Sequence, residues 1–210
     1  MTYFSCFMIN PQRRGAWKLL RSPQAMHAAV MATLPPDTDY SESRILWRLD
    51  ESKHAPVLYM LSPERPDFSA LVEQAGWHTR PGESAHYGRL LAKLENGQEW
   101  AFRLAANPVK RHTNKQTGKR EGAPQWGFEV IPAVEGQDIE ECPMVSSRQD
   151  LAFARRNAEG KVGKVTHRKA QFDGALRITD VELFRQSLLS GMGRGKAYGM
   201  GLLTLVPLSR

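Results

Sequence analysis

Residues 191–201 read GMGRGKAYGMG, with five glycines in eleven positions. This density disfavours regular helix or strand, because glycine loses more backbone freedom on folding than any other residue. Apolar residues at helical spacing precede the stretch, and the run Leu202–Pro207 after it is typical of a buried strand. The sequence therefore predicts a glycine-rich loop that joins a helix to a strand near the end of the chain.

The loop carries two cations, Arg194 and Lys196, among backbone N–H groups, which is a pattern suited to holding phosphate. It matches neither of the common nucleotide motifs. Ala197 follows the lysine where a Walker loop has Ser or Thr, and a dinucleotide fingerprint has its strand before the glycines and its helix after them. The loop indicates contact with phosphate outside these motifs, and the alternative is an ordinary turn.

The charge of the chain points to a polyanionic partner. Its 210 residues are 41% hydrophobic and 24% charged, as in a folded domain, and 29 Lys and Arg against 22 Asp and Glu give a net charge of +7. The sequence has no apolar run of bilayer length and no signal-peptide pattern, so we expect nucleic acid, no membrane and a cytoplasmic location. Cys6 and Cys142 are expected to be free thiols.

The first half predicts the element order β-α-β-β-α-β. Ser22-Pro23 is a typical helix start, with a hydroxyl cap and a proline at the first helical position, whereas Arg13 and Arg14 are expected in an exposed connection before it. Asp67 is expected to cap a second helix that ends at Gly76. Strands are expected at Tyr3–Ile9, Ile45–Leu49, Val57–Leu61 and somewhere between Trp77 and Leu94. This is the ferredoxin-like order, which RNA-recognition domains share.

The second half predicts a more degraded copy of the same unit. Asn96-Gly97 marks a tight turn and a domain boundary, which divides the chain into domains 1–95 and 96–210. Asp173-Gly174 predicts a hairpin turn, and Thr179-x-x-Glu182 predicts the capping box of the helix before the glycine loop. Strands are expected near Trp100–Leu104, Trp126–Ile131, Lys161–Gln171 and Ala175–Thr179. The predicted fold class is α+β, with two tandem ferredoxin-like (RRM-like) domains.

Three positive features fall in this second half: a loop at residues 107–120, a tract at residues 155–169 and the glycine loop. A single charge run is usually a solvated face. Three in one domain favour nucleic acid, with Lys and Arg contacting phosphates. RNA is favoured over duplex DNA, because ferredoxin-like units are common RNA platforms and the DNA-binding motifs are absent from the sequence.

The candidate for chemistry is His27, on the flank of the first predicted helix. The sequence shows no metal-ligand spacing and no carboxylate cluster, so no metal is expected. RNA can be cut without one when its own 2′-OH attacks phosphorus and an imidazole protonates the leaving 5′-oxygen. The alternative is a half-buried structural histidine.

Three motifs together resemble the CasE family of CRISPR repeat-RNA endoribonucleases of type I-E systems. They are PxxMH at residues 23–27, FRLxANPxKR at residues 102–111 and GRGKAYGMGLLT at residues 193–204. The resemblance runs in order over nearly the whole chain. It implies two tandem ferredoxin-like domains and metal-independent cleavage at the 3′ base of a repeat hairpin, which leaves a 5′-hydroxyl and a 2′,3′-cyclic phosphate.

The resemblance also assigns partners and residues. The partners would be a CRISPR repeat RNA hairpin, kept bound after cleavage, and the other Cascade subunits, with no small-molecule cofactor. His27 would be the general acid. Some relatives have an assisting tyrosine three residues before the histidine. This chain has Gln24 at that assisting position, and because glutamine cannot serve as an acid, the second catalytic role stays unassigned. The expected RNA-binding residues are Arg13, Arg14, Arg103, Lys110, Arg111, Lys115, Lys119, Arg120, Arg155, Arg156, Lys161, Lys164, Arg168, Lys169, Gly193, Arg194, Gly195, Lys196 and Gly199.

Two other functions stay open on the sequence. Because glutamine cannot act as an acid, Gln24 allows a non-catalytic subunit that binds an RNA hairpin within a ribonucleoprotein complex. The glycine loop allows an enzyme that binds a nucleotide. The connection between Arg120 and Trp126 is also short for the helix expected early in the second domain.

Overall fold

The structure is a computed structural model that describes residues 1–41, 44–51, 54–108, 125–133, 143–156 and 162–208, with the backbone alone at 152–156 and 162–167. The elements of the first half are β1 (Tyr3–Met8), α1 (Arg14–Arg21), α2 (Pro23–Met31), β2 (Leu46–Asp50), β3 (Val57–Ser62), α3 (Ser69–Ala75), β4 (Glu83–His86) and α4 (Gly88–Leu91). Those of the second half are β5 (Glu99–Ala106), β6 (Phe128–Ile131), β7 (Met144–Arg156), β8 (Val162–Ile178), α5 (Val181–Ser190), the 3-10 turn η2 (Lys196–Tyr198) and β9 (Leu203–Pro207).

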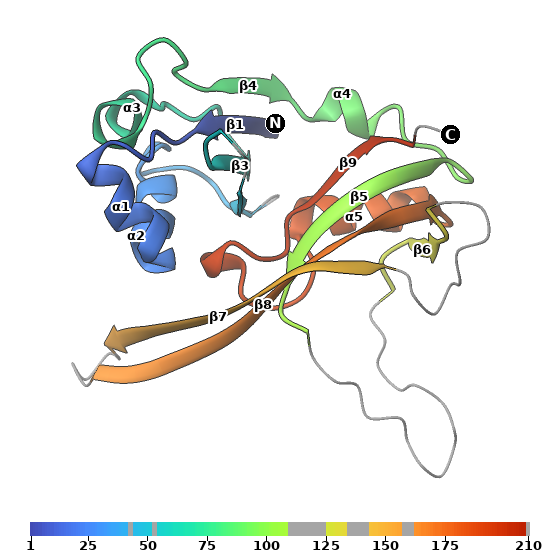
Figure 1. Cartoon of the computed structure of the whole chain (residues 1–210). Coiled ribbons are helices and arrows are strands. Elements are labelled where there is room, and N and C mark those ends of the chain that lie inside the picture. The colour runs from blue at the N-terminus through green and yellow to red at the C-terminus, as the bar shows by residue number, and fades with distance from the viewer. Residues whose placement is uncertain (42–43, 52–53, 109–124, 134–142, 157–161, 209–210) are drawn as a thin grey trace.

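The first four strands form an antiparallel sheet in the order β2-β3-β1-β4. Helices α1, α2 and α3 lie together on one side of it (Figure 1). Their apolar side chains pack on the residues of the strands that face them, including Phe7, Trp47 and Met60. The strand order and the helix placement are those of a ferredoxin-like unit with one additional helix, α1.

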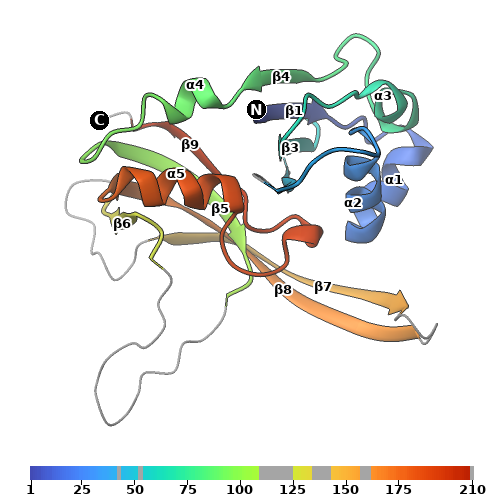
Figure 2. The same ribbon diagram turned by 180° about the vertical axis from the view of Figure 1, so that it is seen from behind.

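The second sheet has the corresponding order β6-β8-β5-β9, with α5 against it (Figure 2). Among the described residues between β5 and β6 there is no helix, and residues 109–124 lie outside the description. Strand β8 pairs with β5 through Ala170–Arg177 and with β7 through Val162–Asp173. The β7–β8 ribbon therefore runs on past the sheet and beneath α1 and α2 (Figure 1). The predicted α+β class with two tandem ferredoxin-like units is confirmed.

The two sheets share part of one core. The second apolar cluster is built around Phe102, Leu176 and Phe184 of the second unit, and it also contains Leu46 and Leu61 from the first sheet. The units are thus packed against each other through their strands. None of the described helices is long and apolar enough to cross a bilayer.

The hairpin turn predicted at Asp173-Gly174 is wrong, because both residues lie inside the continuous strand β8. Gly174 pairs with Phe102, and a Cβ at this position would lie 3.2 Å from the Phe102 ring and 3.0 Å from Cβ of Pro143. The glycine allows close packing across the sheet. A turn-like dipeptide in the sequence does not distinguish these two uses of glycine.

Two helix starts also differ from the sequence prediction. Arg14 begins α1, where an exposed connection was expected, and a Cβ on Gly15 would collide with the backbone carbonyl of Gln74 next to it. The packing of α1 on α3 therefore requires glycine at a position where the sequence pattern disfavours a helix. The cap of α5 is Asp180, whose Oδ1 accepts from the Leu183 N–H at 3.0 Å, and this is one residue later than the capping box predicted at Thr179.

Candidate active site and nucleic-acid interface

Helix α2 places His27 at the edge of the first core. The helix begins as predicted, because Ser22 Oγ accepts from the Ala25 N–H at 3.2 Å and Pro23 occupies its first turn. Met26 and Val30 are fully buried and fix the rotation of the helix. His27 is half-buried on the flank, one turn after Pro23 and on the same face.

The surroundings of the His27 imidazole leave one of its nitrogens without a partner and affect its charge. Its Nδ1 is buried and has no hydrogen-bond partner among the described residues. Burial lowers the pKa of His27 below its ordinary value of 6.5, because the surrounding protein disfavours the charged form. A phosphate close to the ring would favour the charged form and oppose that shift. Gln24 lies one turn before His27 on α2, where its amide can donate a hydrogen bond but cannot deliver a proton.

The glycine loop folds against α2 and β2. Its 3-10 turn η2 contacts both elements, and a Cβ on Gly199 would lie 2.6 Å from the Trp47 ring. Gly199 has φ 75°, a left-handed conformation that also favours glycine. The loop therefore carries Lys196 and Tyr198 from the second unit to the helix that holds His27.

The loop satisfies several of its own backbone groups. The N–H of Tyr198 donates to the Gly195 carbonyl at 2.8 Å, and the N–H of Gly201 donates to the Ala105 carbonyl at 2.7 Å. Lys196 Nζ donates to the Gly193 carbonyl at 3.0 Å, whereas Arg194 is exposed. Some of the backbone N–H groups that were predicted to hold phosphate are therefore already hydrogen-bonded within the protein. Arg194 and Lys196 supply the positive charge of the loop.

A groove of about 370 Å³ lies where α1, α2, β2 and η2 face the β7–β8 ribbon. We call it the helix–hairpin groove. It is lined by Leu19, Leu20, Arg21, Pro23, Met26, Trp47, Leu49, Glu51, Gln149, Asp150, Leu151, Lys169 and Tyr198. Both units contribute to it, so the groove exists only when they are packed together.

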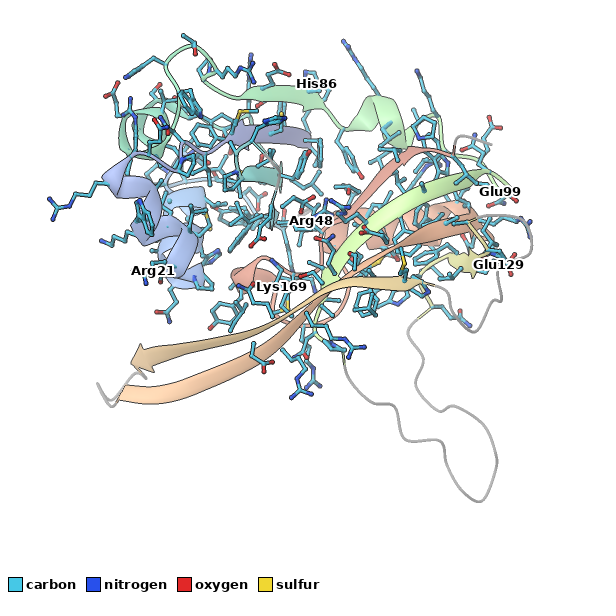
Figure 3. The ribbon with its side chains drawn as sticks, viewed as in Figure 1. Arg21, Arg48, His86, Glu99, Glu129 and Lys169 are labelled. Atoms are coloured by element: carbon cyan, nitrogen blue, oxygen red, sulfur yellow. The ribbon has the colours of Figure 1, made fainter. Side chains whose placement is uncertain are left out.

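Lys169 is the cation deepest in this groove. It lies on β8 near the crossing of the hairpin and the second sheet (Figure 3). Its pKa is lowered chiefly by burial, while the charges of Asp50 and Glu51 raise it and that of Arg48 lowers it. Lys169 pairs with Gln149 across the ribbon, so its side chain is held by a strand and not by a loop.

A buried arginine connects the two sheets. Arg48, which is 2% exposed, donates to Asp50 through Nε at 2.6 Å and through Nη2 at 2.9 Å. Its Nη1 donates to the carbonyls of Arg103 at 2.8 Å and Leu202 at 3.1 Å, and Nη2 donates to Thr204 Oγ1 at 2.9 Å. This set of contacts, the Arg48 clasp, fixes β2 against β5 and against the start of β9, directly after the glycine loop.

Arg103, for which contact with RNA is predicted, is engaged in ion pairs in this structure. Its guanidinium pairs with Asp173, with Nε–Oδ1 at 2.6 Å, and reaches Asp50 Oδ2 at 3.4 Å. Because two carboxylates already pair with this guanidinium, it is less available to bind phosphate. The same side chains line a larger cavity of about 930 Å³ between the sheets, to which α1 and α2 contribute no residue.

The other predicted RNA-binding residues fall into three groups. Arg13 donates to the Glu73 carbonyl and ties α1 to α3, Arg14 is exposed on α1, and Arg168 pairs with Asp150 at 3.3 Å on the hairpin surface. The side chains of Arg155, Arg156 and Lys164 lie outside the description, although their backbones belong to the ribbon. Lys110, Arg111, Lys115, Lys119, Arg120 and Lys161 lie wholly outside the described residues.

Three residues that the sequence analysis did not select adjoin this site. Arg21 and Tyr198 line the helix–hairpin groove, and Trp17 is 58% exposed on the neighbouring surface of α1. For α1, the signal present in the sequence is the spacing of Arg14, Trp17, Lys18 and Arg21, which places them on one side of a helix.

Together, these features define a tandem ferredoxin-like protein with a histidine beside a groove shared by both units. A family model described as CRISPR associated protein matches residues 2–207. The chain is 30% identical to the CRISPR-associated endoribonuclease Cse3 of Thermus thermophilus, over 95% of this chain and 97% of the relative. The chain belongs to this family of CRISPR-associated proteins and is of the CasE type, as its sequence motifs indicated.

Solved structures show the same fold. A structure of the CRISPR endoribonuclease Cse3 bound to a 19-nucleotide RNA matches with a TM-score of 0.71 and 27% identity, over 98% of this chain and 99% of that chain. Thermus thermophilus Cse3 bound to an RNA that represents a pre-cleavage complex matches with a TM-score of 0.68 and 26% identity, over 98% and 99%. The Cas6e protein of Escherichia coli, at 18% identity and a TM-score of 0.52 over 99% and 100%, shares the fold.

Proposed function

We propose that this protein is a metal-independent endoribonuclease that cuts CRISPR precursor RNA at the 3′ base of the repeat hairpin. The observation that carries the proposal is that α2 holds His27 half-buried and contributes its neighbours Pro23 and Met26 to a groove that the second unit helps to build. The 30% identity to Cse3, named an endoribonuclease, supports it. The first unit, residues 1–95, supplies the catalytic histidine, and the second, residues 96–210, grips the RNA.

The reaction needs one nucleophile, one acid and positive charge. The 2′-hydroxyl of the nucleotide before the cut attacks the adjacent phosphorus, so the 2′-O–P bond forms as the P–5′-O bond breaks. The imidazolium of His27 gives its proton to the leaving 5′-oxygen, which yields a 5′-hydroxyl and a 2′,3′-cyclic phosphate. Cations of the groove and the glycine loop, Lys169 and Arg194 among them, stabilise the charge that accumulates on the phosphorane oxygens.

The environment of His27 fits an acid of this kind. A lowered pKa makes the imidazolium a readier proton donor, and the approaching phosphate restores the protonated fraction that burial removes. Gln24 can hydrogen-bond the phosphate or the 2′-oxygen but leaves proton removal to solvent or another group. The product, with its stem held by the second unit, stays bound and joins the other Cascade subunits.

The test is cleavage of an end-labelled repeat hairpin in EDTA under single-turnover conditions. Wild type is expected to cut once below the stem and leave a cyclic phosphate. His27→Ala is expected to bind the hairpin with unchanged affinity and to lose at least about 100-fold in rate, as is typical for loss of a general acid. The control His78→Ala, an exposed histidine in the segment after α3, is expected to cut like wild type.

Gln24 favours one second candidate, a non-catalytic subunit that binds the RNA hairpin. Tight binding with no cleavage by wild type would support that subunit and contradict the endoribonuclease. Equal cleavage by wild type and His27→Ala would confirm the endoribonuclease activity and would show that His27 is not its general acid.

A further inference from the structure

Helix α1 presents an exposed face on which three cations surround a tryptophan. Arg14, Trp17, Lys18 and Arg21 follow the i, i+3, i+4, i+7 spacing and all four are exposed, with Trp17 at 58%. We call this face the α1 platform. Ala16 and Leu19, on the opposite side, are buried in the first core. The core therefore accounts for one side of α1 and leaves the platform without a packing role.

Within the described part of the chain, the cations of the α1 platform have no carboxylate partner. None of its three cations forms an ion pair with a carboxylate among the residues that the structure describes, and the helix itself contains no acidic residue. In contrast, Arg168 and Arg177, which are also exposed, each pair with a carboxylate. The platform is thus a local concentration of positive charge that no carboxylate of the described residues pairs with.

Trp17 gives the platform a flat apolar surface. The Arg21 guanidinium carbon lies 6.0 Å from the centre of its ring, within range of a cation–π contact. An exposed aromatic ring among cations is the arrangement that proteins use for single-stranded nucleic acid, in which bases stack on rings and cations follow the phosphates. This combination distinguishes the platform from an ordinary solvated charge run.

The platform is continuous with the candidate active site. Arg21 belongs to both, because it also lines the helix–hairpin groove together with Pro23 and Met26 of α2. Helices α1 and α2 are separated by Ser22 alone and pack on each other. A strand of RNA that leaves the groove beside α2 can therefore pass directly onto the exposed side of α1.

We propose that the α1 platform binds unpaired nucleotides that flank the RNA stem, with Trp17 stacking on a base and Arg14, Lys18 and Arg21 contacting phosphates. This inference rests on the proposed function, since it places the flank of the same RNA whose stem the second unit grips. It adds a binding site in the first unit and a ligand, single-stranded RNA.

Other occupants fit the platform less well. A membrane surface would need several apolar side chains on the exposed face, and Trp17 is the single one on the platform. The centre of a protein interface is depleted of charge, whereas three of the four platform residues are charged. The positive charge of the platform therefore favours a polyanion, single-stranded RNA, over a membrane surface or a protein partner.

The experiment compares hairpins that differ only in their flanks. Four RNAs carry the same stem-loop with no flank, a 5′ flank, a 3′ flank or both, and each has a 2′-deoxy substitution at the cleavage site so that binding is measured without cleavage. Affinities are measured for wild type, Trp17→Ala, Trp17→Phe and Lys18→Gln. Lys93→Gln, which removes one exposed lysine after α4, is the charge-matched control.

Trp17→Ala is expected to weaken binding of a flanked hairpin about tenfold, the value of one stacked base, and to leave the hairpin without flanks unchanged. Trp17→Phe is expected to retain most of the affinity because phenylalanine still stacks. Lys18→Gln is expected to weaken flanked RNA and to lower the salt dependence of its binding, which Lys93→Gln should not do. Whether the affinity falls for the RNA with the 5′ flank or for the RNA with the 3′ flank identifies which flank binds the platform.

Equal losses on hairpins with and without flanks, or no loss on either, would overturn the α1 platform as a single-strand site. A Trp17→Ala variant that binds every RNA like wild type but no longer binds anionic vesicles would assign the platform to a membrane surface instead. If wild type binds none of the four RNAs, it is the proposed function that fails, and the two failures are therefore distinct.

Discussion

The two ferredoxin-like units share a strand order and differ in what surrounds their sheets. In the first, three helices cover the sheet and pack a continuous apolar core, so His27 sits on a rigid support. In the second, the sheet extends into the β7–β8 ribbon and the glycine loop, which reach across to the helices of the first. One topology thus supplies a firmly supported histidine in one copy and extended basic elements in the other.

Because the second unit extends over the first, the protein depends on the interface at which the two units meet. The helix–hairpin groove needs both units in a fixed relation, and the Arg48 clasp joins β2 to β5 and β9 at a point next to the glycine loop. Substitutions at the interface between the units should therefore lower the stability of the whole protein. Substitutions within the β7–β8 ribbon or the glycine loop should instead affect RNA binding or local stability. The following changes test this contrast, from the largest expected effect to the smallest.

Arg48→Met should destabilise the protein by about 3–5 kcal/mol, because it removes the nearest partner of the buried Asp50 carboxylate and leaves only the longer contact with Arg103 at 3.4 Å. Urea unfolding of wild type and variant measures the change. The control is Arg177→Met, which removes an arginine at the surface of the second sheet that pairs with Glu99 and Glu129, and it should cost less than about 1 kcal/mol. Similar losses in both variants would mean that the clasp is not what holds the units together.

Gly199→Ala should destabilise the protein by roughly 2–4 kcal/mol, from the left-handed backbone together with the collision with Trp47. Gly193 has φ 73° but open space around it, so Gly193→Ala should cost only about 1–2 kcal/mol for its backbone conformation. Thermal unfolding compares the two. A Gly193→Ala variant as unstable as Gly199→Ala would show that the close approach of the loop to β2 contributes nothing.

The smallest effect concerns His27 and pH. Because burial lowers its pKa in the folded protein, the unfolded chain binds the proton more tightly. Stability should therefore fall as the pH is lowered through about 6.5 toward the folded pKa, and His27→Gln should remove this part of the dependence. Urea midpoints of both proteins at about pH 7.5 and 5.5 measure the difference.

A nuclear magnetic resonance titration of the His27 ring gives the same quantity directly. Its midpoint should lie below the ordinary value in the free protein and should rise when a non-cleavable hairpin brings a phosphate close to the ring. A midpoint at or above the ordinary value in the free protein would remove burial as the dominant influence on His27.

Much of the fold could be predicted from local signals. The Ser22-Pro23 helix start, the strands of the first sheet and the position of the glycine loop between a helix and a strand all agree with the structure. Three local signals gave wrong results. Asp173-Gly174 lies inside β8, Asp180 replaces Thr179 as the cap of α5, and α1 begins at Arg14 where a connection was expected. In the first and third cases, a glycine is required by a close contact with a distant segment.

The site was predictable in part. His27 and the basic second half were selected from the sequence, and in the structure Pro23 and Met26 of the same helix line a groove to which that half contributes. Whether a cation is free could not be predicted. Arg103 has no feature in the sequence that separates it from Arg14, and yet one is paired with two carboxylates and the other is exposed. The two carboxylates that pair with Arg103 lie 53 and 70 residues away along the chain.

The sequence by itself determined most of the elements and their order, the net positive charge and the family, because periodicity, caps and short motifs depend on neighbouring residues. The tertiary structure alone decided which charges are neutralised, where the units meet and what lines the helix–hairpin groove. Arg48 illustrates the reason, since it joins Asp50, two residues away, to Leu202, 154 residues away. Such contacts depend on strand register and on the packing of two sheets, which no local pattern specifies.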